Sequence, residues 1–151
     1  MLGRFEKFSF AIAQINKYWH RIANEEMKRY GLKGTYAMYL IAMCQYPDGI
    51  TAASLGEVCG KDKADVSRTV SDMIGKGLIV RDVSKSKNMY RALLFLTDKG
   101  KEAAKVIENR AGVAVEAAGG TLTEEQREIF YGTLDKIVVS LKNISEKGLP
   151  Y

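Results

Sequence analysis

Apolar side chains recur every three or four positions over most of the chain, which predicts a mainly helical fold. The first such stripe covers residues 4–29. A second helix is expected over residues 34–46, where it stops at a Pro-Asp-Gly turn. Thr97 is expected to begin a third long helix, and Thr123 opens a capping-box pattern ahead of the last one.

Between these helices, residues 49–81 read as two short helices around a tight turn, followed by an extended run. Thr51 and Asp62 stand where the N-caps of the two helices should be. Gly60 between them suits the left-handed conformation that commonly ends a helix. The second helix carries an apolar stripe at helical spacing, which is made by Val66, Val70, Met73 and Ile74. This layout predicts a helix-turn-helix.

The opposite face of the second helix is short or basic, so it can approach a nucleic-acid groove without a clash. Its residues are Lys63, Ala64, Ser67, Arg68 and Ser71. An arginine can bond two acceptors on a guanine edge, and a serine can reach bases or phosphate. Asp65 and Asp72 argue the other way, because carboxylates repel phosphates. A plain helix pair with a solvated polar face is therefore the alternative interpretation.

A basic hairpin is expected after the turn unit. Two β-prone runs, 79–83 and 89–96, flank a polar linker that carries Lys85 and Lys87, and Arg91 follows. Residues 61–91 hold eight Lys or Arg and four Asp, a net +4, while the whole chain is +5. Such clustering is the electrostatic pattern expected of a nucleic-acid-binding element. The predicted fold class is mainly α with a small β-hairpin wing, that is, a winged helix-turn-helix with additional N- and C-terminal helices.

The chain resembles the MarR family of winged-helix transcriptional regulators. Besides the helix-turn-helix, the resemblance rests on four short motifs: Tyr30-Gly31-Leu32, Tyr46-Pro47-Asp48-Gly49-Ile50-Thr51, Lys76-Gly77-Leu78-Ile79-Val80-Arg81 and Leu96-Thr97-Asp98-Lys99-Gly100. It implies one domain over residues 1–151, with dimerisation helices in 1–30 and 101–147 and the winged helix-turn-helix in 33–98. It also implies a homodimer that binds double-stranded DNA at a pseudo-palindromic operator, usually as a repressor, with affinity tuned by a small molecule or an oxidant.

The wing departs from the family pattern at one place. The family commonly has an Asp-Arg-Arg-like cluster before the second wing strand, where this chain has Asn88, Met89 and Tyr90. Arg91 is one residue further on. Either Arg91 takes the minor-groove role through a shifted wing, or the wing uses Lys85 and Lys87 on phosphates.

Aromatic and methionine residues gather near the expected junction of the dimerisation and DNA-binding parts. Tyr18, Tyr36, Tyr39 and Met43 are candidates to line a pocket for a small lipophilic or aromatic effector, because such pockets are mostly apolar. The alternative is that these side chains belong to the core.

Oxidant sensing is a second route to regulation, and it needs an exposed, acidic thiol. Cys44 and Cys59 both look like small buried hydrophobic residues. Peroxide sensors of the family place a reactive cysteine near the start of the first helix, and this chain has none there.

Several function classes lack their signatures. No nucleophile elbow, phosphate loop or dinucleotide fingerprint is present, so an enzyme is not expected. His20 is the only histidine, and no metal or cofactor site is predicted. The sequence has no long apolar run and no signal-peptide pattern. We therefore expect a cytoplasmic protein that does not associate with membranes. The main alternative to a DNA-binding regulator is a winged-helix protein-interaction module without specific DNA binding.

Overall fold

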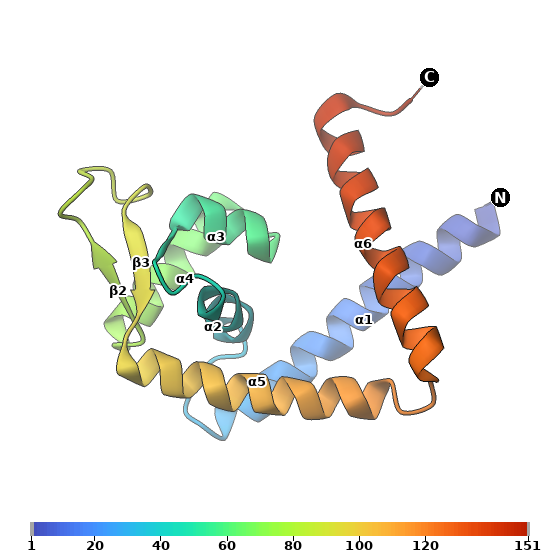
Figure 1. Ribbon diagram of the computed structural model, residues 1–151, viewed down its shortest axis with the longest axis horizontal. Coiled ribbons are helices and arrows are strands. Elements are labelled where there is room, and N and C mark those ends of the chain that lie inside the picture. The colour runs from blue at the N-terminus through green and yellow to red at the C-terminus, as the bar shows by residue number, and fades with distance from the viewer. Residues whose placement is uncertain (1, 151) are drawn as a thin grey trace. The chain divides into compact units, whose positions relative to one another are not determined.

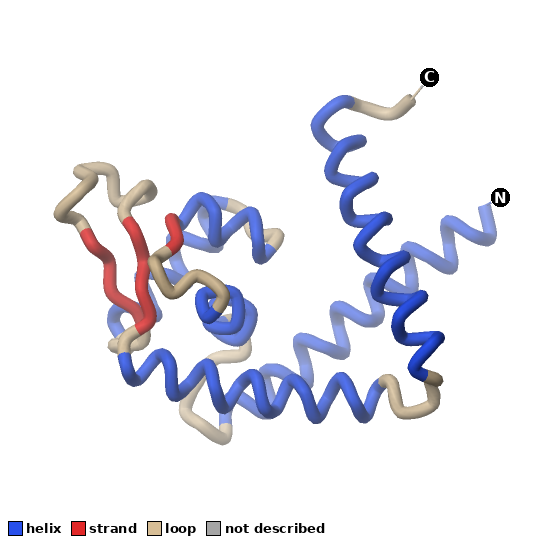
Figure 2. The backbone as a smooth tube through the Cα atoms, in the orientation of Figure 1, coloured by secondary structure: helices blue, strands red, loops and turns tan. Residues whose placement is uncertain are grey.

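A computed structural model describes residues 2–150, and its elements are drawn in Figures 1 and 2. In this part of the chain the order is α1 (Leu2–Lys28), α2 (Tyr36–Cys44), β1 (Ile50–Thr51), α3 (Ala52–Cys59), α4 (Lys63–Gly75), β2 (Ile79–Asp82), β3 (Leu93–Leu96), α5 (Asp98–Ala118) and α6 (Glu124–Lys147). The mainly helical fold with a small β wing is confirmed, and the expected helices begin and end within a few residues of their predicted bounds.

The sheet has one more strand than the sequence suggested. It is antiparallel with the order β1-β3-β2, and β3 pairs with both neighbours. Leu94 of β3 lies opposite Ile50 on one side and Arg81 on the other. The short strand β1 was not predicted, because two residues after a turn give no periodicity to read.

The core of the winged helix lies between α2, α3, α4 and the sheet. Helix α3 packs against both α2 and α4, and α4 packs against β2. The largest fully buried side chains include Tyr36, Tyr39, Leu55, Met73 and Leu94. These side chains come from all the packed elements, so the helix-turn-helix and the sheet share one core.

The chain divides into two compact units, residues 1–111 and residues 112–151, and α5 runs through the boundary between them. In the first unit α1 exposes large apolar side chains, among them Phe5, Phe10 and Ile15. In the second unit α6 begins with the predicted capping box, in which Thr123 and Gln126 bond each other's backbone N–H groups, and none of its residues is buried. No helix in the described residues is both long and apolar enough to cross a membrane.

Candidate nucleic-acid interface

The turn between α3 and α4 has the caps that the sequence predicts. The Thr51 hydroxyl accepts a hydrogen bond from the backbone N–H of Ser54 at 3.1 Å, and the Asp62 carboxylate accepts one from the N–H of Asp65 at 2.8 Å. Gly60 ends α3 in the left-handed conformation, with φ of 64°. At Gly56 an added Cβ would lie 2.8 Å from Val66 Cγ2, so the glycine allows the two helices to pack closely.

Helix α4 has one buried face and one exposed face. Val66, Thr69, Val70 and Met73 are buried against the core. The five residues expected to face nucleic acid are all exposed: Lys63, Ala64, Ser67, Arg68 and Ser71. Ala64, Ser67, Arg68 and Ser71 follow the three- and four-residue spacing of a single helix face. The structure therefore brings a basic and hydroxyl-bearing surface together along α4.

The two carboxylates that argued against DNA binding point toward α2. Asp65 Oδ1 accepts a hydrogen bond from the Tyr39 hydroxyl at 2.5 Å. Asp72 Oδ2 accepts hydrogen bonds from the Tyr36 hydroxyl and the Lys33 ammonium, each at 2.6 Å. Both carboxylates thus have hydrogen-bond partners on the side of α4 that faces α2, which weakens the objection from phosphate repulsion.

The two strands of the wing are shorter, and the loop between them is longer, than the sequence indicated. Residues 83–92, which join β2 to β3, form a long loop at the far end of the sheet (Figure 2). Asn88 organises the end of the loop: its side chain accepts from the N–H of Tyr90 at 2.9 Å, and its carbonyl accepts from the N–H groups of Arg91 and Ala92. Met89 to Ala92 were predicted as strand, but Asn88 caps a local turn there instead.

All three basic residues expected in the wing, Lys85, Lys87 and Arg91, are exposed. The wing also contains a contact that the sequence alone does not indicate. The ammonium of Lys63, the first residue of α4, lies 4.8 Å from the centre of the Tyr90 ring. This is within the range of a cation–π interaction. Tyr90 occupies one of the positions at which the wing departs from the family pattern, and that departure is the signal that could have found it.

The base of the wing is braced by the start of α5. The Thr97 hydroxyl donates to the Gly77 carbonyl at 2.6 Å and accepts from the N–H of Gly100 at 3.0 Å. A side-chain carbon on Gly100 would overlap the Leu78 carbonyl oxygen. In the Leu-Thr-Asp-Lys-Gly motif, the threonine thus joins α5 to the turn after α4 by hydrogen bonds. The glycine is needed for steric reasons, because a side chain at its position would not fit against that turn.

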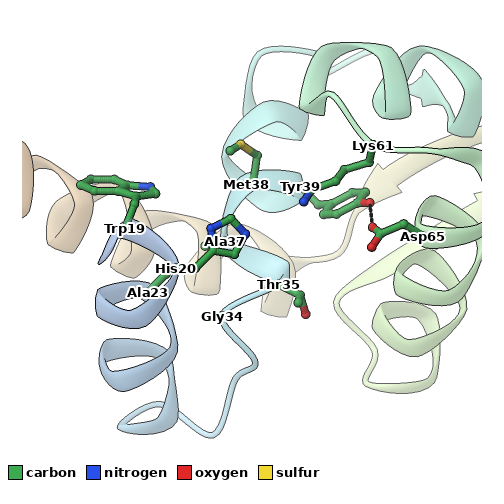
Figure 3. Close-up of a pocket in the computed structure, with 10 residues that line it drawn as sticks. All are labelled: Trp19, His20, Ala23, Gly34, Thr35, Ala37, Met38, Tyr39, Lys61 and Asp65. Carbon is green, nitrogen blue, oxygen red and sulfur yellow. Dashed lines mark hydrogen bonds between the residues drawn. The ribbon is translucent and has the colours of Figure 1, made fainter. Parts of the chain in front are cut away.

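An open pocket lies in the first unit where α1, α2 and the helix-turn-helix meet (Figure 3). Its lining combines apolar and polar side chains from these elements: Trp19, His20, Ala23, Gly34, Thr35, Ala37, Met38, Tyr39, Lys61 and Asp65. Tyr39 is the only member of the predicted effector set among them. Tyr36 and Met43 are buried in the core, and Tyr18 is exposed on α1.

The two cysteines differ in exposure. Cys59 is buried, and burial raises the pKa of its thiol to about 11. Cys44 is exposed, contrary to the expectation of a buried residue, but partial desolvation and Glu108 still raise its thiol pKa. Neither thiol has the acidic character that peroxide sensing requires. Among the described residues no group of three or more His, Cys, Asp or Glu could hold a metal ion.

Comparisons with known proteins agree with this geometry. Residues 30–86 match the model of the MarR family. No curated protein sequence matches the chain.

Similar solved structures cover most of the chain. A MarR transcriptional regulator from Methanosarcina mazei Go1 has a TM-score of 0.82 at 20% identity, over 92% of each chain. A putative MarR family regulator from Listeria monocytogenes, complexed with 26mer DNA, has a TM-score of 0.81 at 24% identity, over 93% of this chain and 95% of that chain. The MepR–DNA complex of S. aureus has a TM-score of 0.78 at 19% identity, over 89% of this chain and 97% of that chain. At these identities the likeness shows the fold. The resemblance to the MarR family is therefore confirmed: residues 30–86 match its model, and the chain has the winged-helix fold of MarR family transcriptional regulators.

Proposed function

We propose that this chain is a sequence-specific DNA-binding transcriptional regulator that places α4 in the major groove. The observation that carries this proposal is the face of α4 on which Lys63, Ser67 and Arg68 are exposed, while Asp65 and Asp72 are bonded toward α2. Arg68 is proposed to read a base edge, and Lys63 and Ser67 to contact bases or phosphate. Ala64 and Ser71 are small enough to let the helix approach the groove.

The wing is proposed to bind the sugar–phosphate backbone beside the groove. Lys85, Lys87 and Arg91 are all exposed in the loop between β2 and β3. Lysines on an exposed loop act as point charges on phosphates and add affinity without sequence preference. Arg91 follows the Asn88-capped turn and is the candidate for the minor groove.

A homodimer is the proposed assembly. The dimerisation helices are proposed to lie in residues 1–30 and 101–147, with the winged helix-turn-helix in 33–98. In each unit taken by itself, α1 and α6 expose large apolar side chains such as Phe5, Ile15, Ile129 and Val138. Exposed apolar patches of this kind mark interaction surfaces. Two copies of α4 about 34 Å apart would read successive turns of a pseudo-palindromic operator.

Repression tuned by a small lipophilic or aromatic effector is the proposed mode of regulation. The pocket in Figure 3 offers the Trp19 ring and the Met38 side chain beside the polar groups of His20 and Lys61. Its wall includes the Tyr39–Asp65 hydrogen bond, so a bound molecule would lie next to the first turn of α4. A ligand shifts DNA affinity only if its own affinity differs between the DNA-bound and free states.

Trp19 gives a direct assay for this pocket, because the chain contains a single tryptophan. Titration of small aromatic acids and their neutral analogues should change the tryptophan fluorescence and release operator DNA over the same concentration range. Compounds that change the fluorescence and leave DNA affinity unaltered would show a pocket without a regulatory role. No enzymatic activity or cofactor is proposed, and a DNA regulator of this kind would act in the cytoplasm.

The test of the function is fluorescence anisotropy with DNA from upstream of the protein's own gene and with scrambled DNA, over a salt series. Selective binding that weakens with salt supports the regulator, because each neutralised phosphate releases counterions. Equal, weak binding to both DNAs would favour the second candidate, a winged-helix protein-interaction module. That module would bind its protein partner with little salt dependence.

A further inference from the structure

Two tyrosines of α2 reach across to α4 and bond its carboxylates. The Tyr39 hydroxyl donates to Asp65 Oδ1 at 2.5 Å, and Figure 3 shows this bond at the wall of the pocket. The Tyr36 hydroxyl donates to Asp72 Oδ2 at 2.6 Å. Helices α2 and α4 are thus joined directly at two points, in addition to their shared packing against α3.

The spacing of the four residues makes the two bonds act together. Tyr36 and Tyr39 are three residues apart and lie next to each other on one face of α2. Asp65 and Asp72 are seven residues apart, close to two full turns, so they lie on one side of α4. A single bond would let α4 swing about one point. Two bonds about 10 Å apart along the helix axis also fix its direction and its rotation.

Both anchors are rigid at the tyrosine end. Tyr36 and Tyr39 are each only 1% exposed, so their rings are held by the core. Lys33 adds a second donor to Asp72 at 2.6 Å, and this contact and the Tyr36 bond hold the pKa of Asp72 below its usual value. Burial and the neighbouring carboxylates raise the pKa of both tyrosines. The two hydroxyls therefore remain donors at neutral pH, and the Asp72 carboxylate remains an acceptor.

We propose that Tyr36 and Tyr39 are positioning residues for DNA recognition, which set the tilt and rotation of α4 through Asp72 and Asp65. This inference rests on the proposed function of α4 as the helix that enters the groove. Recognition of base edges requires donors and acceptors at fixed places, and a supporting shell of hydrogen bonds keeps them there. Phosphate contacts tolerate small shifts of the helix far better than base contacts do.

The variants Tyr36→Phe and Tyr39→Phe remove one hydroxyl each and keep the buried ring. Each variant should bind operator DNA roughly threefold to thirtyfold more weakly, because a hydrogen bond to a charged group is lost. Binding to scrambled DNA should stay the same, since Lys63, Arg68 and the wing lysines are unchanged. The ratio of the two affinities is the readout that a merely structural role would not move.

Two matched variants complete the test. Tyr46→Phe removes a hydroxyl that bonds to no described part of the chain, from a side chain that is 40% exposed, so operator affinity should not change. Asp65→Asn keeps an oxygen that can accept from the Tyr39 hydroxyl, so selective binding should largely survive. Equal losses on operator and scrambled DNA, or no loss in either tyrosine variant, would overturn the positioning role.

Amide hydrogen exchange tests the two anchors without any DNA. In both tyrosine variants the amides of α4 should exchange faster while those of α5 keep their rates. Unchanged exchange in α4 would show that the bonds do not restrain it and would overturn the proposal. Failure of the unmodified protein to select its operator would instead reject the proposed function, and the exchange rates would still decide whether α4 is held at two points.

Discussion

The Lys63 ammonium lies 4.8 Å from the centre of the Tyr90 ring, so the first residue of α4 touches the turn that closes the wing. The two elements that would contact DNA are therefore coupled through a cation and an aromatic face. Tyr90 lies near the positions at which the MarR family commonly has arginines. In this chain Tyr90 contacts the basic side chain of Lys63 in α4 and carries no positive charge of its own.

Loss of the Tyr90 ring should weaken DNA binding modestly. Tyr90→Leu removes the aromatic face, and we expect affinity for operator to fall about twofold to fivefold, the range of an exposed cation–π contact. Tyr90→Phe keeps the face and should bind like the unmodified protein. Anisotropy titrations of the three proteins make the comparison. Equal losses in the Leu and Phe variants would show that the hydroxyl, and not the ring, is what matters.

The wing lysine Lys85 should contribute affinity without selectivity. Lys85→Ala should weaken binding to operator and scrambled DNA by the same factor, because a phosphate contact carries no sequence information. The slope of log affinity against log salt concentration should flatten by roughly 0.9, the contribution of one phosphate. A control is Lys101→Ala, which removes an exposed lysine from α5. An unaltered slope in Lys85→Ala would place the wing away from DNA.

Gly100 should be intolerant of any side chain. Its Cβ position is occupied by the Leu78 carbonyl oxygen, so Gly100→Ala forces α5 away from the turn after α4 and should cost about 1–3 kcal/mol of stability. Gly112→Ala is the matched control, because α5 continues there and a Cβ would meet nothing within 4 Å. That variant should be neutral or stabilised by up to about 1 kcal/mol. Urea unfolding measures both, and equal stabilities would contradict the steric account.

The Asp72 contacts should make stability depend on pH in the acid range. Bonds from Lys33 and Tyr36 lower the pKa of Asp72 in the folded protein. The contribution of Asp72 to the free energy of unfolding is therefore complete above the pKa that it has in the unfolded chain. It is lost as the pH falls through the lower pKa that it has in the folded protein. Asp72→Asn should be less stable than the unmodified protein at neutral pH, and the gap should close on acidification. A stability difference between the two proteins that stays constant from neutral pH down to about pH 3 would exclude this role.

Much of the fold follows from local signals in the sequence. Thr51, Asp62 and Thr123 cap helices as expected, and Gly60 has the left-handed conformation that ends α3. These features depend on neighbouring residues only, so a single sequence reveals them. The exposed face of α4 was predictable for the same reason, since helical periodicity separates it from the apolar stripe.

The features that the sequence did not reveal depend on residues far apart in the chain. In the sequence Asp65 and Asp72 argue weakly against DNA binding, and only the packing of α2 beside α4 brings Tyr39 and Tyr36 to them. Of the four residues expected around an effector pocket, only Tyr39 lines the pocket in Figure 3, and the burial of Tyr36 and Met43 depends on the whole core. The second wing strand is shorter than predicted, because β-prone side chains give no sign of the turn that Asn88 caps.

We propose that Arg68 reads the operator from the exposed face of α4. The most direct measurement is the affinity of Arg68→Ala for operator and for scrambled DNA at one salt concentration. We expect a loss of about 1–3 kcal/mol on the operator and a much smaller loss on scrambled DNA. Unchanged operator affinity, or an equal loss on both DNAs, would contradict the placement of this helix in the major groove.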